Sequence, residues 1–131
     1  MAIKKMISYS AVVLDDKSRK KLFDTFAKII PSDYEVIGDH MTINMGEIDP
    51  KYVKMLGLNL GLRVDGSAKN EYVVAVRISN FTLEGKTPHI TIAVNRKNGG
   101  KPVMSNNITE WEPYLRPLIL TGTVKEVESK F

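Results

Sequence analysis

The feature of the sequence that most constrains its fold is the alternation of apolar and polar residues in the segment 58–64, LNLGLRV. Its apolar residues recur at every second position, so they would lie on one face of an extended strand. The loop 65–70, DGSAKN, leads into a second strand-like segment at 71–79, and together they predict a β-hairpin. Further strands are predicted at residues 10–14, 34–45, 87–95 and 118–127. Hairpins with alternating faces favour antiparallel sheet.

One segment has the period of an amphipathic helix. Residues 15–30, DDKSRKKLFDTFAKII, place their apolar side chains along one stripe, and Asp15 or Asp16 can cap the N-terminus. A second, shorter helix is predicted at 49–56, with Asp49 as its cap. We therefore expect an α+β fold in which one or two helices pack outside antiparallel sheets.

Length and composition limit the class of protein. The chain has 131 residues and no linker divides it, so we expect residues 1–131 to form a single domain. No apolar run approaches the roughly 20 residues needed to cross a bilayer, and the start of the sequence lacks a signal-peptide pattern. The chain also has no cysteine. We therefore expect a cytoplasmic protein that has no contact with membranes and needs no obligate protein partner.

The formal net charge of +4 favours an anionic partner, such as a nucleotide or RNA. A charge of this size is also common among proteins that have no such partner. The basic residues are scattered, apart from the run KSRKK at 17–21, which is typical of the solvent-facing side of a helix. Charge alone therefore indicates a partner class only weakly.

Both histidines of the chain lie in the same four-residue phrase, which reads HMTI from His40 and HITI from His89. In a strand, side chains two residues apart share a face and are separated by about 7 Å. His40 would therefore lie beside Thr42, and His89 beside Thr91. The same alternation assigns Met45 to the opposite, buried face of its strand. If the two strands are neighbours, two histidines and two threonines converge on one patch.

This set of groups suits the cleavage of a phosphodiester. A neutral histidine can accept a proton from the attacking hydroxyl, and a protonated histidine can donate one to the leaving oxygen. The threonine hydroxyls can donate hydrogen bonds to the non-bridging oxygens, where negative charge develops. Two histidines without a cysteine make a poor zinc site, because a catalytic zinc usually has three protein ligands. The pattern indicates acid–base chemistry without a metal or cofactor, and it leaves open which histidine is the base.

The paired phrases resemble the signature of the two-histidine (2H) phosphoesterase superfamily. The resemblance implies two pseudo-symmetric lobes whose motif strands meet in a central cleft. It implies that His40 and His89 are the acid and the base, and that Thr42 and Thr91 are phosphate ligands. Members of this superfamily open 2′,3′-cyclic phosphates, process RNA ends or, in viruses, destroy cyclic nucleotide signals used in defence.

The expected activity is therefore that of a phosphodiesterase that cleaves a cyclic or 3′–5′ phosphodiester of a nucleotide or RNA. The alternative is a nucleotide- or RNA-binding module that uses the same cleft without turnover. In the plainest alternative, both histidines are ordinary polar residues on the solvent-facing side of strands.

Five further residues are candidates for binding the substrate: Tyr9, Arg77, Lys101, Ser105 and Asn106. Tyr9 is suited to stacking on a base and Arg77 to contacting phosphate, although either side chain is equally suited to packing or to solvent. The other three belong to the polar loop 95–107, NRKNGGKPVMSNN, which directly follows the second motif strand. We expect this loop to cover the cleft and select the substrate, and the alternative is an exposed, disordered hairpin.

Overall fold

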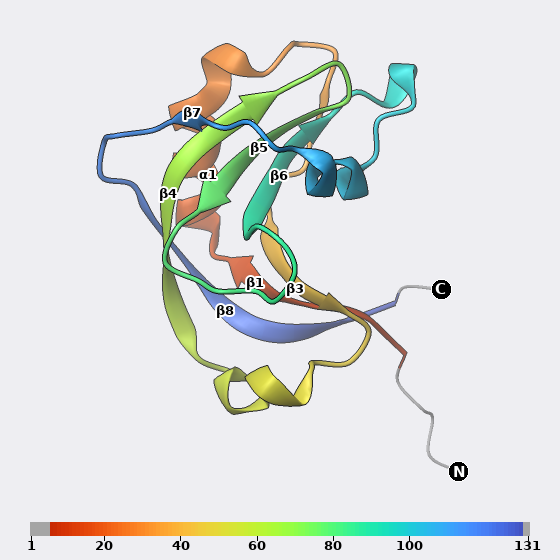
Figure 1. Cartoon of the computed structure of the whole chain (residues 1–131), viewed down its shortest axis with the longest axis vertical. Coiled ribbons are helices and arrows are strands. Elements are labelled where there is room, and N and C mark those ends of the chain that lie inside the picture. Colours follow the sequence, from red (N-terminus) through yellow and green to blue (C-terminus); the bar gives the residue numbers. More distant parts are fainter. Residues whose placement is uncertain (1–5, 130–131) are drawn as a thin grey trace.

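The computed structural model describes residues 6–129, in which eight strands form one antiparallel sheet and one α-helix packs against it (Figure 1). The strands are β1(Ile7–Leu14), β2(Glu35–Val36), β3(His40–Met45), β4(Asn59–Lys69), β5(Val73–Ile78), β6(His89–Val94), β7(Glu112–Pro113) and β8(Ile119–Glu128). The helices are α1(Asp16–Phe26) and the short 3-10 helices η1(Ala27–Ile29), η2(Pro50–Met55), η3(Arg96–Asn98) and η4(Pro102–Asn107). The predicted α+β class is confirmed, and its strands belong to one continuous sheet.

The sheet closes on itself through the two motif strands. Its main strand order is β3-β1-β8-β4-β5-β6, and β6 also pairs with β3. This order is symmetric about the central β8–β4 pair, because β1 and β5 flank that pair and β3 and β6 come last on either side. In Figure 1, β1 and β3 lie in the lower half of the molecule, and β5 and β6 lie in the upper half. The fold therefore consists of two similar halves, and each half supplies one motif strand.

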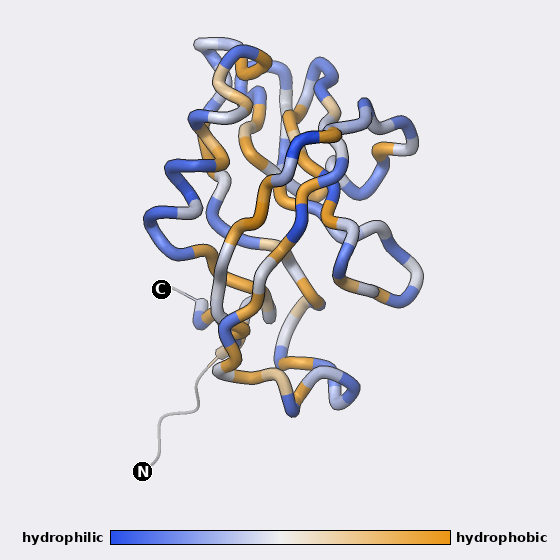
Figure 2. Tube along the Cα trace, turned by 90° about the vertical axis from the view of Figure 1, so that its left-hand side faces the viewer, coloured by the Kyte–Doolittle hydropathy of each residue, from blue (hydrophilic) through white to orange (hydrophobic). Residues whose placement is uncertain are grey.

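The core lies between the rolled sheet and α1. In β4, Leu62 and Val64 are buried as the alternation predicts, whereas Leu58 lies before the strand begins and is exposed. In β5 every residue except Arg77 is buried. Figure 2 shows hydrophobic segments along the strands in the middle of the molecule and mostly hydrophilic segments in the outer turns. Burial of the sheet's inner face stabilises the roll and leaves the polar side chains of the motif strands outside the core.

Helix α1 is fixed to the sheet at its first turn and along its apolar stripe. Asp15 is the N-cap and accepts a hydrogen bond from the backbone N–H of Ser18 at 2.8 Å. The Ser18 hydroxyl in turn lies 3.1 Å from the Thr121 hydroxyl on β8. Leu22 and Phe26 are buried against the sheet. The helix ends at Phe26, earlier than predicted, and its last residues form η1 instead.

The predicted strand 34–45 is wrong as a single strand, because a bulge at residues 37–39 divides it into β2 and β3. Both pieces run along the same edge of β6, with Glu35 opposite Val94 and Met41 opposite Ile90. Gly38 lies in the bulge with φ of +47°, a value that favours glycine. The carbonyl of Asp39, the residue before His40, accepts a hydrogen bond from the Leu14 backbone N–H at the end of β1 at 2.9 Å.

Two other predicted segments differ in type. The predicted loop 65–70 is mostly strand, because residues 66–69 pair with β5 in the register from Gly66–Arg77 to Lys69–Val74. Cross-strand pairing here outweighs the turn-like composition of DGSAKN. The predicted helix 49–56 is the 3-10 helix η2, with Asp49 accepting a hydrogen bond from the Lys51 backbone N–H at 2.9 Å.

The loop 95–107 is ordered by packing and is not a disordered hairpin. It forms η3 and η4, and Arg96 of η3 pairs with Glu35 of β2 at 2.7 Å. Gly100 is buried where a side chain would collide with backbone atoms of Tyr72 and Asn95. Close backbone packing therefore holds the start of η4 against the second half of the sheet.

Candidate active site

The two motif strands meet at a single pair of residues, Met41 and Ile90, which lie opposite each other in antiparallel register. Both of these side chains are fully buried. In an antiparallel pair the neighbouring residues then lie His against Thr, so that each histidine faces the threonine of the other motif. The two phrases are related by an approximate two-fold axis through the Met41–Ile90 pair.

A pocket of roughly 360 Å³ opens over this junction. Its lining residues are Tyr9, Ile37, His40, Thr42, Met45, Lys86, His89, Thr91, Pro102, Val103 and Asn106. The volume lies within the range of small-molecule sites, which are mostly apolar and have a few polar groups that orient the ligand. The structure thus brings both histidines and both threonines into one pocket.

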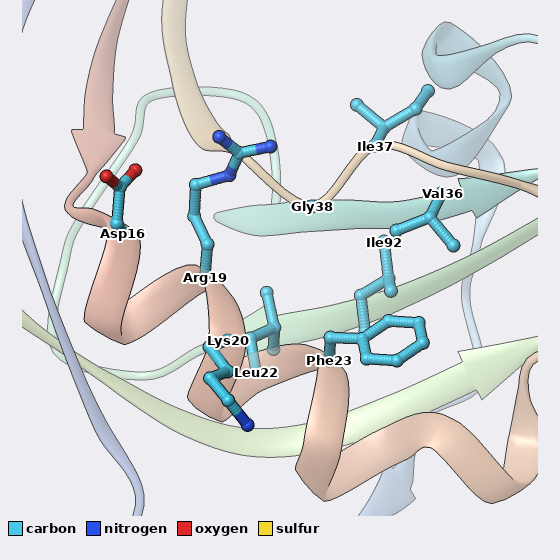
Figure 3. Close-up of a pocket in the computed structure, with 9 residues that line it drawn as sticks. All are labelled: Asp16, Arg19, Lys20, Leu22, Phe23, Val36, Ile37, Gly38 and Ile92. Atoms are coloured by element: carbon cyan, nitrogen blue, oxygen red, sulfur yellow. The ribbon is translucent and has the colours of Figure 1, made fainter.

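A second hollow of roughly 280 Å³ lies between α1 and the bulge that precedes β3 (Figure 3). Figure 3 shows Arg19 and Phe23 of α1 on one side of it, and Val36 and Gly38 on the other. Neither histidine lines this hollow. It therefore lies outside the pocket that holds the motif histidines, although Ile37 lines both hollows.

His40 is held by a carboxylate and by an aromatic ring. Its Nδ1 lies 2.5 Å from Oδ1 of Asp39, and the hydrogen bond to His40 is the main cause that lowers the pKa of that carboxyl. The ionised carboxylate accepts the Nδ1 hydrogen, which leaves Nε2 available for chemistry. Tyr9 stacks on the imidazole with ring centroids 4.6 Å apart. Burial, and then the negative charge of Asp39, raise the pKa of Tyr9.

His89 has a different environment. Its Nδ1 lies 2.8 Å from the backbone carbonyl of Thr87. A carbonyl can only accept, so Nδ1 carries the hydrogen and the neutral ring has its lone pair on Nε2. Burial is the main cause that lowers the pKa of His89, the charges of Lys86 and His40 lower it further, and the hydrogen bond to Thr87 opposes them. His89 therefore favours the neutral form that can accept a proton.

The two threonines also differ. The Thr91 hydroxyl lies 2.8 Å from the Ser105 hydroxyl and 3.3 Å from the carbonyl of Pro102, both of which belong to η4. Ser105 is only 1% exposed. The Thr42 hydroxyl has no hydrogen bond to another residue of the range 6–129. Thr42 is thus free toward the pocket, whereas Thr91 is oriented by η4.

The five predicted substrate-binding residues divide into two groups. Tyr9 and Asn106 line the pocket, although one face of the Tyr9 ring is already covered by His40. Arg77, Lys101 and Ser105 do not line it. The guanidinium of Arg77 bonds a carboxylate on β4 at 2.8 Å, Lys101 is exposed, and Ser105 is buried against Thr91. That these three residues contact a substrate stays a prediction, and their positions outside the pocket do not favour it.

Several residues in or beside the pocket are not predicted from the sequence. Lys86 lines the pocket, and Asp39 lies behind it against His40; each is within three residues of a motif histidine. A charged residue this close in sequence to each motif histidine is a signal from which both could be predicted. Met45 was assigned to the buried face but is 77% exposed and lines the pocket. A register shift between β1 and β3, where Ser10 pairs with Asn44 and Ala11 with Thr42, breaks the alternation of faces.

Residues 6–129 contain neither a cluster of metal ligands nor a membrane-spanning helix. No group of three or more histidine, cysteine, aspartate and glutamate side chains is placed to hold a metal ion in this part of the chain. No helix in the same range is both long enough and apolar enough to cross a membrane.

Comparison with known proteins identifies a related fold. No family model and no curated protein sequence matches the chain. The crystal structure of E. coli LigT complexed with NADP+ is 16% identical, with a TM-score of 0.51 over 97% of this chain and 96% of that chain. The complex with 3′-AMP is 15% identical over the same shares, also with a TM-score of 0.51. The apo form is 16% identical and covers 98% of this chain and 96% of that chain, with a TM-score of 0.51. The chain therefore has an antiparallel α+β fold similar to that of LigT along almost its whole length.

Proposed function

We propose that the protein is a metal-independent phosphodiesterase that cleaves a cyclic or 3′–5′ phosphodiester of a nucleotide or RNA. The observation that carries this proposal is the pair of imidazoles in one pocket. Each is fixed through Nδ1, and neither Nε2 has a hydrogen-bond partner within residues 6–129. LigT is a 2H phosphoesterase and has been crystallised with 3′-AMP and with phosphate, which supports a nucleotide phosphate as the ligand class.

The environments of the two histidines suggest a division of roles. His89 is neutral and its Nε2 accepts the proton of the attacking hydroxyl while the new oxygen–phosphorus bond forms. His40 carries a proton on Nε2 and gives it to the leaving oxygen while the old phosphorus–oxygen bond breaks. Asp39 keeps the other nitrogen of His40 protonated and compensates its positive charge. The proton taken up by His89 and the proton released by His40 balance within one step.

The threonines stabilise the phosphorane-like transition state. Thr42 donates its free hydroxyl hydrogen to one non-bridging oxygen. Thr91 donates to a second oxygen after turning its hydrogen away from the Pro102 carbonyl, and it continues to accept from Ser105. Apolar neighbours such as Met45 and Val103 reduce the local dielectric and so strengthen these interactions.

The donor set supports metal-independent action. Two histidines and two neutral hydroxyls do not supply the three ligands that a catalytic zinc usually has. The Asp39 carboxylate is already hydrogen-bonded to His40.

The test is product analysis with a panel of substrates in the presence of EDTA. The panel contains 2′,3′-cyclic nucleotides, RNA with 2′,3′-cyclic ends and cyclic oligonucleotides. We expect turnover of at least one class, and losses of about 10²–10⁴-fold in rate for His40→Ala and for His89→Ala. Thr42→Ala is expected to cost about 10–10³-fold. Activity that disappears with EDTA and returns with a divalent ion contradicts the mechanism, and binding without turnover across the whole panel supports the binding-module alternative.

A further inference from the structure

We propose that Lys86 is a substrate-binding residue that contacts the reacting phosphate on the His89 side of the pocket. This inference rests on the proposed function, because it assigns the cation that binds the phosphate in the same site. It starts from the position of Lys86, which lines the pocket together with the two histidines and two threonines.

The loop between β5 and β6 places this lysine. Leu83 is 7% exposed and anchors the loop in the core. Gly85 follows in a turn with φ of +76°, which redirects the chain just before Lys86. Thr87 then holds His89 through its carbonyl. Lys86 is therefore carried on a loop that is fixed at both ends, next to the base.

The charges around Lys86 leave it available for an anion. The nearest carboxylate in the sequence of its loop is Glu84, which pairs with Lys51 of η2 instead. Lys86 is half-buried and has no ion pair with any residue of the range 6–129. The described lining of the pocket contains no carboxylate. A half-buried ammonium without a counterion in a largely apolar pocket gains free energy when an anion enters.

The negative charge of the proposed substrate would be attracted to the Lys86 ammonium. A phosphodiester is a monoanion, and negative charge on its non-bridging oxygens interacts with every positive group in the pocket. The hydroxyls of Thr42 and Thr91 are neutral donors, and His89 is neutral when it acts as the base. Lys86 supplies the fixed positive charge on that side, opposite the imidazolium of His40.

Electrostatics support the proximity of Lys86 and His89. Burial lowers the pKa of Lys86, and the charge of Lys86 is among the causes that lower the pKa of His89. The other charged groups that face His89 are His40 across the β3–β6 junction and Arg77 on β5. The charge of Arg77 is compensated by Asp65. We therefore expect removal of Lys86 to change the pKa of His89.

The test compares Lys86→Met with Lys54→Met, which removes the same charge from an exposed position on η2. With the substrate found in the panel, Lys86→Met is expected to raise KM about 10- to 100-fold, while Lys86→Arg restores most of the binding. Lys54→Met is expected to leave KM within twofold of the wild type. An unchanged KM in Lys86→Met overturns the proposal.

Two measurements without turnover separate this inference from the proposed function. Inorganic phosphate binding is followed by calorimetry, and Lys86→Met is expected to weaken it at least tenfold. NMR titration resolves the two histidines of the chain, assigned with His40→Gln and His89→Gln, and the pKa of His89 is expected to rise in Lys86→Met. If no substrate is cleaved but both changes occur, the proposed function fails and the phosphate site stands. If substrate is cleaved and neither change occurs, the assignment of Lys86 fails alone.

Discussion

Replacing Asp39 by asparagine tests how much of the activity depends on the carboxylate beside His40. The change keeps the size of the side chain and removes the charge that accepts the Nδ1 hydrogen at 2.5 Å. A hydrogen bond to a charged group contributes about 1.5–3 kcal/mol. The side chains of His40 and Asp39 are 21% and 42% exposed, so solvent screens part of this interaction. We expect a net effect of about 1–2 kcal/mol on the transition state, which corresponds to roughly 5- to 30-fold slower turnover.

The assay measures kcat at saturating substrate for the wild type, Asp39→Asn and the control Asp33→Asn. Asp33 is an exposed turn residue outside the pocket, so its variant makes the same chemical change without touching His40. Far-UV circular dichroism and urea unfolding check that each variant is folded. The control is expected to keep the kcat of the wild type.

A double variant tests whether Asp39 acts through His40. If it does, adding Asp39→Asn to His40→Ala produces no further loss, because the residue on which Asp39 acts is already absent. Two results refute the reasoning. One is a kcat for Asp39→Asn within twofold of the wild type, and the other is a full additional loss in the double variant.

Three other changes test the site and its support. Burial lowers the pKa of His89 below its ordinary 6.5. The contribution of His89 to stability is therefore complete above about pH 6.5 and is lost as the pH falls through the folded-state pKa. We expect His89→Gln to weaken this acid dependence, measured by urea unfolding between about pH 7.5 and 5. Ser105→Ala removes the hydrogen-bond partner of Thr91. We expect kcat to fall about 3- to 10-fold and the free energy of unfolding to fall by about 0.5–1.5 kcal/mol. A raised KM with unchanged kcat would instead indicate that Ser105 contacts the substrate directly. Gly100→Ala places a methyl group 2.7 Å from the Asn95 carbonyl oxygen and should cost about 1–3 kcal/mol in urea unfolding, with little change expected if η4 moves freely.

Local sequence patterns predict the presence of the strands and of the helix better than the residues at which they begin and end. Alternation identifies the buried face of β4, and the apolar stripe of α1 correctly includes Leu22 and Phe26. The repeated phrase also predicted that His40 and His89 lie on the polar faces of strands. These features depend on residues within one turn or a few strand positions, so a short window of sequence contains them.

The remaining features depend on pairing between distant segments. The bulge at residues 37–39 exists because β2 and β3 both pair with β6 in different registers, and it brings Asp39 beside His40. The exposure of Met45 depends in the same way on a register shift against β1. Ser105 was predicted to face a substrate because it is polar, but η4 packs it against Thr91. Composition alone does not distinguish a buried, hydrogen-bonded serine from an exposed one.

Closure of the sheet brings two nearly identical phrases into one pocket while their histidines keep different environments. The symmetric strand order places β3 and β6 at equivalent positions, so the Met41–Ile90 pair brings the two histidines into one pocket. The segments that precede the strands are not equivalent. A bulge with a carboxylate precedes His40, and an anchored loop with a lysine precedes His89. A negative neighbour compensates the charge of an acid, and a positive neighbour favours the neutral form of a base. In this fold the pairing of the strands brings the motif residues together, and the residues just before each strand are the basis of the proposed division of roles.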